Sequence, residues 1–211
     1  MNLPEIQKTV SSRNKTRKVF LFVYLAAAEG YAGASYGIGY LVPIIKKHSY
    51  DVFVIAITKD ISSEEFRKKV ESFNPSIVGF SCTSPQFLYL KKYSDAIKSN
   101  EDILQICGGS LPTLDSQTVL TQTAVKGVAI GEGEQSVDRL LDNIENSKSI
   151  FDTAGFYWNI DGKIKTNQIP HFIEDLSQLE FPDTSVYEDW MVCNCNNELE
   201  MELSRGGPYE C

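Results

Sequence analysis

Short apolar runs alternate with longer stretches of helical spacing from residue 19 to residue 144. The apolar runs occupy residues 19–27, 52–57, 77–81, 103–107 and 127–130. The helical stretches follow at about 40–48, 62–73, 85–97, 115–122 and 134–144. Continuous apolar runs of this length are typical of parallel strands that are buried on both faces. The alternation therefore predicts an α/β fold: a flavodoxin-like (Rossmann-like), doubly wound, five-stranded parallel sheet with strand order 2-1-3-4-5.

Local signals mark where two of these helices begin and end. Ser62 followed by Glu65 forms a capping-box pattern, in which the serine side chain accepts a backbone hydrogen bond of the first turn. Pro75 follows that helix, and Pro85 stands in the first turn of the next one, where the missing N–H has no helical partner to lose. These residues predict the limits of both helices.

The pattern changes after residue 150. Asp161-Gly162 in the middle of residues 156–165 predicts a β-hairpin. Residues 174–203 contain nine acidic residues and no Lys or Arg, which is typical of a solvated linker. The expected organisation is a loose extension at 1–18, an α/β domain at 19–150, a hairpin with an acidic linker at 151–197, and the incomplete start of a second domain at 198–211.

The first apolar run has a second interpretation. Lys15, Arg17 and Lys18 precede the apolar residues 19–28, which end in three alanines, and this order imitates a secretory signal. The competing interpretation is a first buried strand, which the regular strand and helix pattern after it favours. The run is also too short to cross a bilayer, which takes about 20 residues.

Composition and charge exclude several kinds of partner. The chain is 42% hydrophobic and 23% charged, as is usual for globular proteins. Its net charge of −8 predicts no nucleic-acid partner and no anionic membrane surface, because both require clustered Lys and Arg. Its five cysteines show no disulfide-framework spacing, which favours a reducing cytoplasm.

The sequence lacks the characteristic residues of several common ligand-binding and catalytic sites. Gly37-Ile38-Gly39 lacks the third glycine of a dinucleotide-binding loop, and no Gly-Lys-Ser or Gly-Lys-Thr of a phosphate loop occurs. The acidic cluster and the strand-end Asp and Lys of a phosphoacceptor receiver are absent. No nucleophile elbow is present. Two histidines and the pair Cys193-x-Cys195 do not make a zinc-site pattern.

Small residues end three neighbouring strands of the predicted sheet. Ser81 and Thr83 flank the end of the third strand, Gly108-Gly109 follows the fourth, and residues 131–134 follow the fifth. These glycines either make tight turns only or line a wide binding surface, since ligands of open α/β sheets bind at this edge. Glu132 and Glu134 disfavour a polyphosphate there. A large, mostly uncharged ligand suits such an edge.

Four motifs, taken in order, resemble a known family. They are Gly37-Ile38-Gly39-Tyr40-Leu41, Ser81-Cys82-Thr83, Gly108-Gly109-Ser110-Leu111-Pro112-Thr113 and Gly131-Glu132-Gly133-Glu134. Together with the hairpin, the acidic linker and a C-terminal Arg-Gly-Gly-Pro-Tyr-Glu-Cys sequence, they resemble the N-terminal cobalamin-binding domain of B12-dependent radical S-adenosylmethionine (SAM) enzymes. The resemblance covers residues 19–211.

The resemblance implies a set of cofactor-binding residues. The nucleotide tail of cobalamin would lie between the sheet and the loops after the third to fifth strands, with the corrin over the edge. The implied residues are Tyr31, Gly37, Ile38, Gly39, Ser81, Cys82, Thr83, Gly108, Gly109, Ser110, Leu111, Pro112, Gly131, Glu132, Gly133 and Glu134. Methionine-synthase-like domains carry a histidine where this chain has Tyr31, so cobalamin is expected to bind without a histidine ligand.

The resemblance also implies chemistry outside this chain. Cys211 would be the first of three cysteines that hold a [4Fe-4S] cluster with SAM, and its two partners would lie in the radical SAM domain that follows. The chain alone is then expected to be catalytically silent, in a parent enzyme of methyltransferase type or related radical chemistry. The alternative is a flavodoxin-like protein-interaction module without a ligand.

Overall fold

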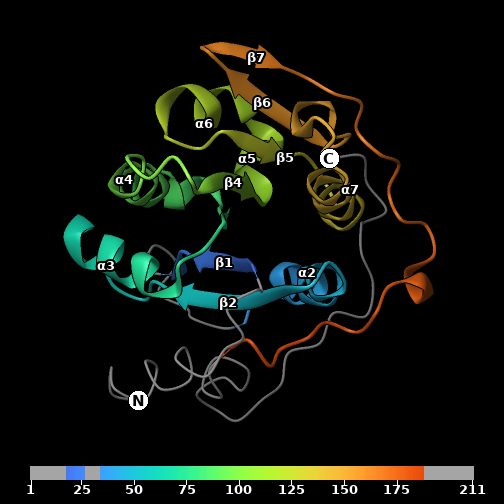
Figure 1. Ribbon diagram of the computed structural model, residues 1–211, viewed down its shortest axis with the longest axis horizontal. Helices are drawn as coiled ribbons and strands as arrows, with labels where there is room; N and C mark the ends of the chain where they lie inside the picture. The colour runs from blue at the N-terminus through green and yellow to red at the C-terminus, as the bar shows by residue number, and fades with distance from the viewer. Residues whose placement is uncertain (1–17, 27–33, 188–211) are drawn as a thin grey trace.

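The computed structural model describes residues 18–26 and 34–187 of the chain. The strands are β1 Lys18–Tyr24, β2 Tyr50–Ala56, β3 Ile77–Ser81, β4 Leu104–Gly108, β5 Gly127–Ala129, β6 Phe156–Ile160 and β7 Lys163–Lys165. They form one sheet in the order β2-β1-β3-β4-β5-β6-β7 (Figure 1). Strands β1 to β5 are parallel, and β6 and β7 continue the sheet antiparallel. The predicted fold class and the strand order 2-1-3-4-5 are confirmed.

Helices cover both faces of the sheet. They are α2 Tyr36–Lys47, α3 Ser63–Phe73, α4 Phe87–Ala96, α5 Ser110–Leu114, α6 Ser116–Gln122 and α7 Glu134–Glu145, with 3₁₀ turns η2 Ser84–Gln86, η3 Ile150–Asp152 and η4 Leu176–Gln178. Figure 1 shows α2 and α7 on one side of the sheet and α3, α4 and α6 on the other. The buried apolar residues accordingly form two clusters, one on each face.

The residues that predicted the start of α3, the start of α4 and the hairpin turn have the expected local structure. The Ser62 hydroxyl accepts a hydrogen bond from the Glu65 N–H at 3.1 Å and caps α3. Pro85 lies in η2, immediately before α4. Asp161 and Gly162 both have positive φ, 50° and 82°, which is the backbone conformation of a two-residue hairpin turn.

The hairpin is part of the sheet, which extends beyond the boundary expected at residue 150. β6 pairs with β5, and Gly127 of β5 lies opposite Trp158 of β6. A Cβ atom at Gly127 would lie 2.4 Å from Trp158 Cζ3, so glycine is what allows the indole to pack on β5. Trp158 is fully buried and stacks on Phe156, with ring centroids 5.3 Å apart. Long-range packing, which leaves no mark in local sequence, attaches the hairpin to the domain.

Residues 174–187 are the described part of the predicted acidic linker, and they are partly buried rather than fully solvated. Asp183 donates its N–H to Gly39 O at 3.0 Å, and its carboxylate lies 2.6 Å from Lys46 Nζ, which lowers the pKa of Asp183 to about 2. Tyr187 is 7% exposed and donates its hydroxyl to Ser35 O at 3.0 Å. This segment therefore packs against α2.

Lys18–Tyr24 forms the strand β1 between β2 and β3, which confirms the strand interpretation of these residues. None of the helices among residues 18–26 and 34–187 has the length and apolar character that a bilayer crossing requires. The predicted extension before residue 18 and the predicted second domain at 198–211 lie outside the described residues.

Candidate cofactor-binding site

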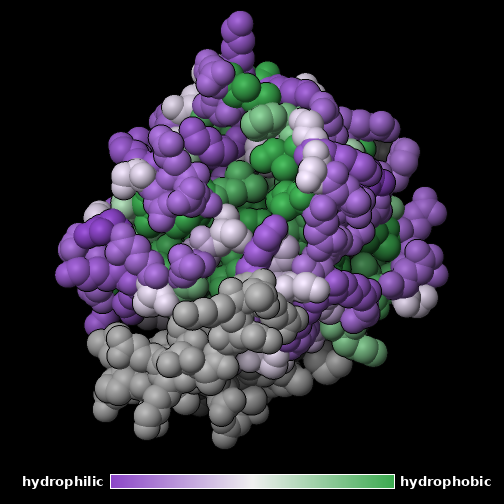
Figure 2. Space-filling model, viewed as in Figure 1, coloured by the Kyte–Doolittle hydropathy of each residue, from purple (hydrophilic) through white to green (hydrophobic). Residues whose placement is uncertain are grey.

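A cavity of about 550 Å³ lies on the α2 and α7 side of the sheet, at the carboxyl ends of the central strands. Its lining is Phe20, Phe22, Tyr36, Gly37, Ile38, Leu41, Gly79, Phe80, Ser81, Ile106, Cys107, Gly108, Gly109, Ala129, Gly131, Glu132, Gly133, Glu134, Val137 and Phe156. Figure 2 shows hydrophobic residues gathered at the centre of this view, between more polar flanks. The cavity is the size of a small-molecule site and is mostly apolar.

Small residues within and at the ends of the central strands leave this space open. Gly79 of β3 and Gly108 of β4 face α2 and α7, because Cβ atoms built there would lie 2.9 Å from Phe20 Cε1 and 3.9 Å from Ala129 Cβ, respectively. Ser81 ends β3 beside them. Larger side chains at these positions would fill the cavity. The sequence therefore builds a hollow where a close-packed interior would otherwise form.

The glycine loop after β4 is held in a conformation that only glycine adopts easily. Gly109 has φ 103°, and a Cβ atom there would lie 2.6 Å from Cys82 O. Thr113 Oγ1 donates to Gly109 O and accepts from Gly131 N–H, both at 3.0 Å. One threonine thus fixes the loops after β4 and β5 relative to each other, although sequence reasoning assigned Thr113 no site role.

The connector, residues 166–187 after the hairpin, crosses the loop between β5 and α7. The Ile173 N–H donates to Glu132 Oε2 at 2.8 Å, and Gln135 Nε2 donates to His171 O at 3.2 Å. A Cβ atom at Gly131 would lie 3.9 Å from the ring of Phe172, which is 73% exposed. The connector therefore supports one wall of the cavity from outside.

The polar groups of the lining are acidic or neutral. Glu132 and Glu134 carry its charge, and none of the described lining residues is Lys, Arg or His. Tyr36 and Ser81 add hydroxyl groups. Burial raises the pKa of the Cys107 thiol, and neighbouring Cys82 raises it further, so Cys107 stays a neutral thiol rather than a reactive thiolate. The part of the lining that the structure describes therefore has no fixed cation for a phosphate-rich ligand.

His48 connects the two helices that form the cavity walls. It ends α2, and its ring nitrogens lie 2.9 Å from Asp138 Oδ1 and 3.0 Å from Glu145 Oε2 of α7. Burial lowers the pKa of His48, but hydrogen bonds and charge attraction from the two carboxylates outweigh it, so the pKa lies above its usual value. The imidazole is therefore a positively charged link between α2 and α7 in weakly acidic solution.

The structure brings most of the predicted glycine positions to one place. The predicted residues in the cavity lining are Gly37, Ile38, Ser81, Gly108, Gly109, Gly131, Glu132, Gly133 and Glu134. Those outside the lining are Gly39, Cys82, Thr83, Ser110, Leu111 and Pro112. Tyr31 and Cys211 lie outside the described residues.

The predicted residues outside the lining have other contacts. A Cβ atom at Gly39 would lie 3.0 Å from Pro182 Cβ, so this glycine allows the connector to approach α2. Cys82 and Leu111 pack in the core on the opposite face of the sheet. The Thr83 N–H donates to Gln86 Oε1 at 2.8 Å at the start of η2. Ser110 is exposed in the first turn of α5.

Sequence reasoning missed the aromatic residues of the lining. Phe20, Phe22 and Phe156 line the cavity, yet an aromatic residue in a strand looks like an ordinary core residue. Gly79 did carry a signal, because a glycine inside an apolar strand often marks a close approach of another group. Within residues 18–26 and 34–187 no group of three or more His, Cys, Asp or Glu side chains could hold a metal ion.

Together, the parallel sheet and the glycine-lined cavity at its carboxyl edge define a small-molecule-binding α/β domain. The family model of the B12 binding domain matches residues 23–141, more than half of the chain. The chain belongs to this family, and the predicted resemblance to cobalamin-binding domains is confirmed.

Two curated relatives align with most of this chain. It is 26% identical over 185 residues to an anaerobic magnesium-protoporphyrin IX monomethyl ester cyclase of Rubrivivax gelatinosus, covering 82% of this chain and 33% of that protein. It is 22% identical over 187 residues to an uncharacterised methyltransferase of Pyrococcus horikoshii, covering 86% of this chain and 40% of that protein. The chain thus spans about a third to two fifths of the length of these relatives.

Two solved structures share the fold. The cobalamin-dependent SAM radical enzyme OxsB, solved with aqua-cobalamin and SAM bound, superposes with a TM-score of 0.64 at 17% identity, over 74% of this chain and 23% of that one. The radical SAM methyltransferase TsrM of Kitasatospora setae, solved with cobalamin and a [4Fe-4S] cluster, gives 0.63 at 12% identity, over 80% of this chain and 32% of that one. At these identities the likeness shows the fold alone.

Proposed function

We propose that this chain is the cobalamin-binding part of a cobalamin-dependent radical SAM enzyme and that its cavity takes the nucleotide tail of cobalamin. The observation that carries the proposal is the glycine-lined cavity between α2 and α7, at the carboxyl ends of the central strands, inside the residues that match the B12 binding domain. A cavity at this edge suits a ligand that extends outward over the loops.

The residues present fit such a tail. The cavity of about 550 Å³ is apolar enough for a heteroaromatic base and is hollow because Gly79, Gly108 and Ala129 lack large side chains. Phe20, Phe22 and Phe156 would exclude water from the base, and the Ser81 hydroxyl would form a hydrogen bond with the tail. When bound, cobalamin supplies a cobalt centre that can carry and transfer a methyl group.

The lower face of the corrin is proposed to lack a histidine ligand. His48 is held between Asp138 and Glu145 and does not line the cavity, nor does His171 of the connector. Electron paramagnetic resonance of the reduced cobalamin complex is expected to show no histidine nitrogen splitting. A nitrogen splitting that disappears in His171→Ala would contradict this part of the proposal.

The chemistry of the parent protein is proposed from its longer relatives. A [4Fe-4S] cluster with SAM, for which Cys211 would supply the first of three cysteine ligands, would work together with the bound cobalamin in a radical SAM domain that contacts this one. Methyl transfer is supported by the methyltransferase relative, and ring formation by the cyclase relative. A cytoplasmic location is supported by the free thiols of Cys82 and Cys107.

Uptake of aquacobalamin by the purified 211-residue chain tests the proposal. The wild-type chain is expected to retain the visible absorbance of cobalamin after gel filtration. Gly108→Trp should fold but lose at least about 100-fold in affinity, because its Cβ position has ordinary contacts while the indole fills the cavity. The matched control is Gln117→Trp, which adds the same side chain on the exposed surface of α6, on the other face of the sheet.

Two results would count against the proposal. A wild-type chain that takes up no cobalamin and gains no thermal stability from it would favour the alternative, a ligand-free interaction module, since a ligand at about 100 times its Kd stabilises by about 2.7 kcal/mol. Undiminished binding by Gly108→Trp would place the ligand outside the cavity.

A further inference from the structure

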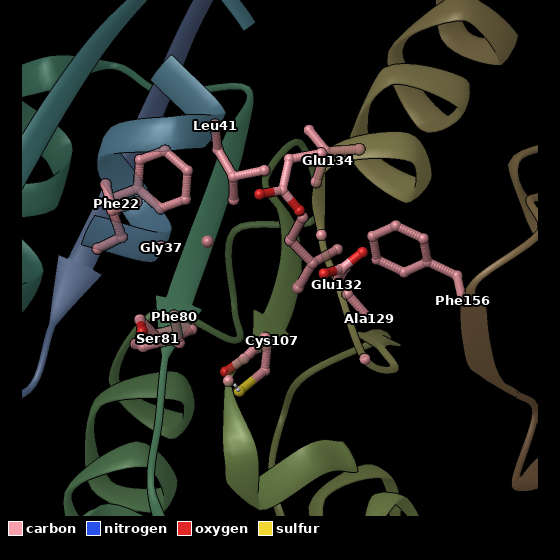
Figure 3. A pocket seen from close by; sticks show the side chains of 18 of the residues that line it. Phe22, Gly37, Leu41, Phe80, Ser81, Cys107, Ala129, Glu132, Glu134 and Phe156 are labelled. Atoms are coloured by element: carbon pink, nitrogen blue, oxygen red, sulfur yellow. Dashed lines mark hydrogen bonds between the residues drawn. The ribbon is translucent and has the colours of Figure 1, made fainter. Parts of the chain in front are cut away.

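The cavity contains a carboxylate that is almost completely buried. Glu134, the first residue of α7, is 5% exposed and lines the cavity, where Figure 3 shows it close to Leu41 of α2. Carboxylates are seldom buried to this degree, because removing the charge from water is costly unless donors replace the water. The N-terminus of α7 favours a negative charge at this position and offsets part of that cost.

The two carboxylates of the lining differ in their burial, since Glu132 is half-buried and Glu134 is almost completely buried. Glu132 Oε2 accepts the N–H of Ile173 at 2.8 Å and so holds the connector at the cavity wall. Glu134 lies deeper, on the side where α2 and α7 approach each other: a Cβ atom at neighbouring Gly133 would lie 3.3 Å from Leu41 Cδ2. Glu134 is therefore the carboxylate placed to meet a ligand that enters between the two helices.

The surroundings of Glu134 set the chemistry of the group it would meet. A carboxylate oxygen accepts hydrogen bonds, and the described lining has no cation that would draw a phosphate toward it. Hydroxyl and N–H donors are favoured at this point, and anionic groups are disfavoured. The ribose of the nucleotide tail of cobalamin carries hydroxyl donors.

We propose that Glu134 selects the nucleotide end of the corrinoid by accepting a hydrogen bond from a ribose hydroxyl. This inference rests on the proposed binding of cobalamin and adds the residue that distinguishes a complete cobalamin from a corrinoid without its tail. Glu134 is a specificity residue in this account, and the apolar lining supplies contact area that does not discriminate.

The test compares two ligands against the same variants. Affinities for aquacobalamin and for cobinamide, which lacks the nucleotide, are measured by absorbance titration of the 211-residue chain. Glu134→Met removes the acceptor and should weaken cobalamin about 10-fold to 100-fold, as expected for a hydrogen bond to a charged group. It should leave the affinity for cobinamide unchanged. Glu134→Gln, which keeps one acceptor oxygen, should lose less.

Asp142→Asn removes the same charge from an exposed position of α7 and is the matched control, expected to change neither affinity. Thermal unfolding checks that each variant is folded. If Glu134→Met does not fold, the comparison of the two ligands is made with Glu134→Gln. Equal losses for both ligands, or no loss for cobalamin, would overturn the role of Glu134 while leaving cobalamin binding intact. A wild-type chain that binds neither corrinoid would instead overturn the proposed function.

Discussion

The two faces of the sheet are built from the same strands and end up different. On the face covered by α3, α4 and α6, Val78 of β3 is buried in a continuous apolar cluster. On the face of α2 and α7, Gly79 and Ser81 of the same strand line a cavity, as does Gly108 of β4. Alternate residues of a strand point to opposite faces. One strand can therefore supply a packed core and an open binding site at once.

This difference between the two faces predicts that substitutions affecting stability and substitutions affecting ligand binding can be told apart. Both faces contain a buried apolar cluster, but only the α2 and α7 face also has a cavity, so ligand affinity should depend on that face. Substitutions on the packed face should change stability alone, and substitutions in the cavity lining should change binding more than stability.

The largest stability effect is expected for Phe66→Ala on the packed face. Phe66 is fully buried, with its ring centroid 4.6 Å from that of Tyr93. Removing a buried phenyl ring leaves a hole that neighbours only partly fill, so urea unfolding should show a loss of about 3–5 kcal/mol. The affinity of the folded protein for cobalamin should stay the same. An affinity loss comparable to that of a cavity variant would break the separation of the two faces.

A smaller loss, of about 1–3 kcal/mol, is expected for Gly79→Ala, because the added methyl group pushes the rings of Phe20 and Phe22. Those rings would move into the cavity, so cobalamin affinity should fall as well, in a titration of the folded variant. Gly37→Ala is the control: its Cβ would meet only Ser35 Oγ, at 3.9 Å, and it should not destabilise the protein. If Gly79→Ala bound cobalamin normally, the cavity lining around Gly79 would tolerate an added methyl group, contrary to our inference.

Thr113→Val should have a modest effect on stability. It removes the hydroxyl that joins the two glycine loops, at a cost of about 0.5–1.5 kcal/mol in urea unfolding, and should weaken cobalamin binding because the loops lose their fixed spacing. Thr121→Val on α6 deletes a similar hydroxyl, whose Oγ1 donates to Gln117 O at 2.8 Å, and should leave binding unchanged. Equal binding losses in the two variants would remove the special role of Thr113.

The smallest effect concerns the pH dependence of the link between α2 and α7. Because the folded pKa of His48 is raised above the unfolded value of 6.5, its stabilisation is fully present below that value and is lost as the pH rises through the folded pKa. The size is about 1 kcal/mol or less. Thermal unfolding between about pH 5 and 8 should show this slope in the wild type and not in His48→Gln. His171→Gln should retain the slope, and a slope that persists in His48→Gln would assign it to another group.

Local patterns in the sequence were enough to predict the parallel strands, their order, the hairpin turn and the cap at Ser62. The position of the hairpin and of the connector could not be predicted in the same way. The contact between Tyr187 and Ser35 joins residues 152 positions apart, and no local period marks it. Such contacts depend on how finished elements pack together.

Prediction of the site from sequence was limited in the same way. The glycines at the strand ends were visible in sequence, because glycine directly after a buried strand indicates a tight turn or a close approach of a ligand. Phe22 and Phe156 were not, since an aromatic residue on a strand looks the same whether it packs in a core or lines a cavity. Gly39 was placed with the cofactor but lies against Pro182, because a glycine signals a close approach without naming what approaches.

A crystal structure of the chain grown with cobalamin tests the central claim most directly. We expect the nucleotide tail to lie inside the cavity between α2 and α7, against Gly108 and Ala129. We expect Glu134 to form a hydrogen bond with a ribose hydroxyl. Cobalamin bound elsewhere, with the cavity filled by the protein's own side chains, would contradict it.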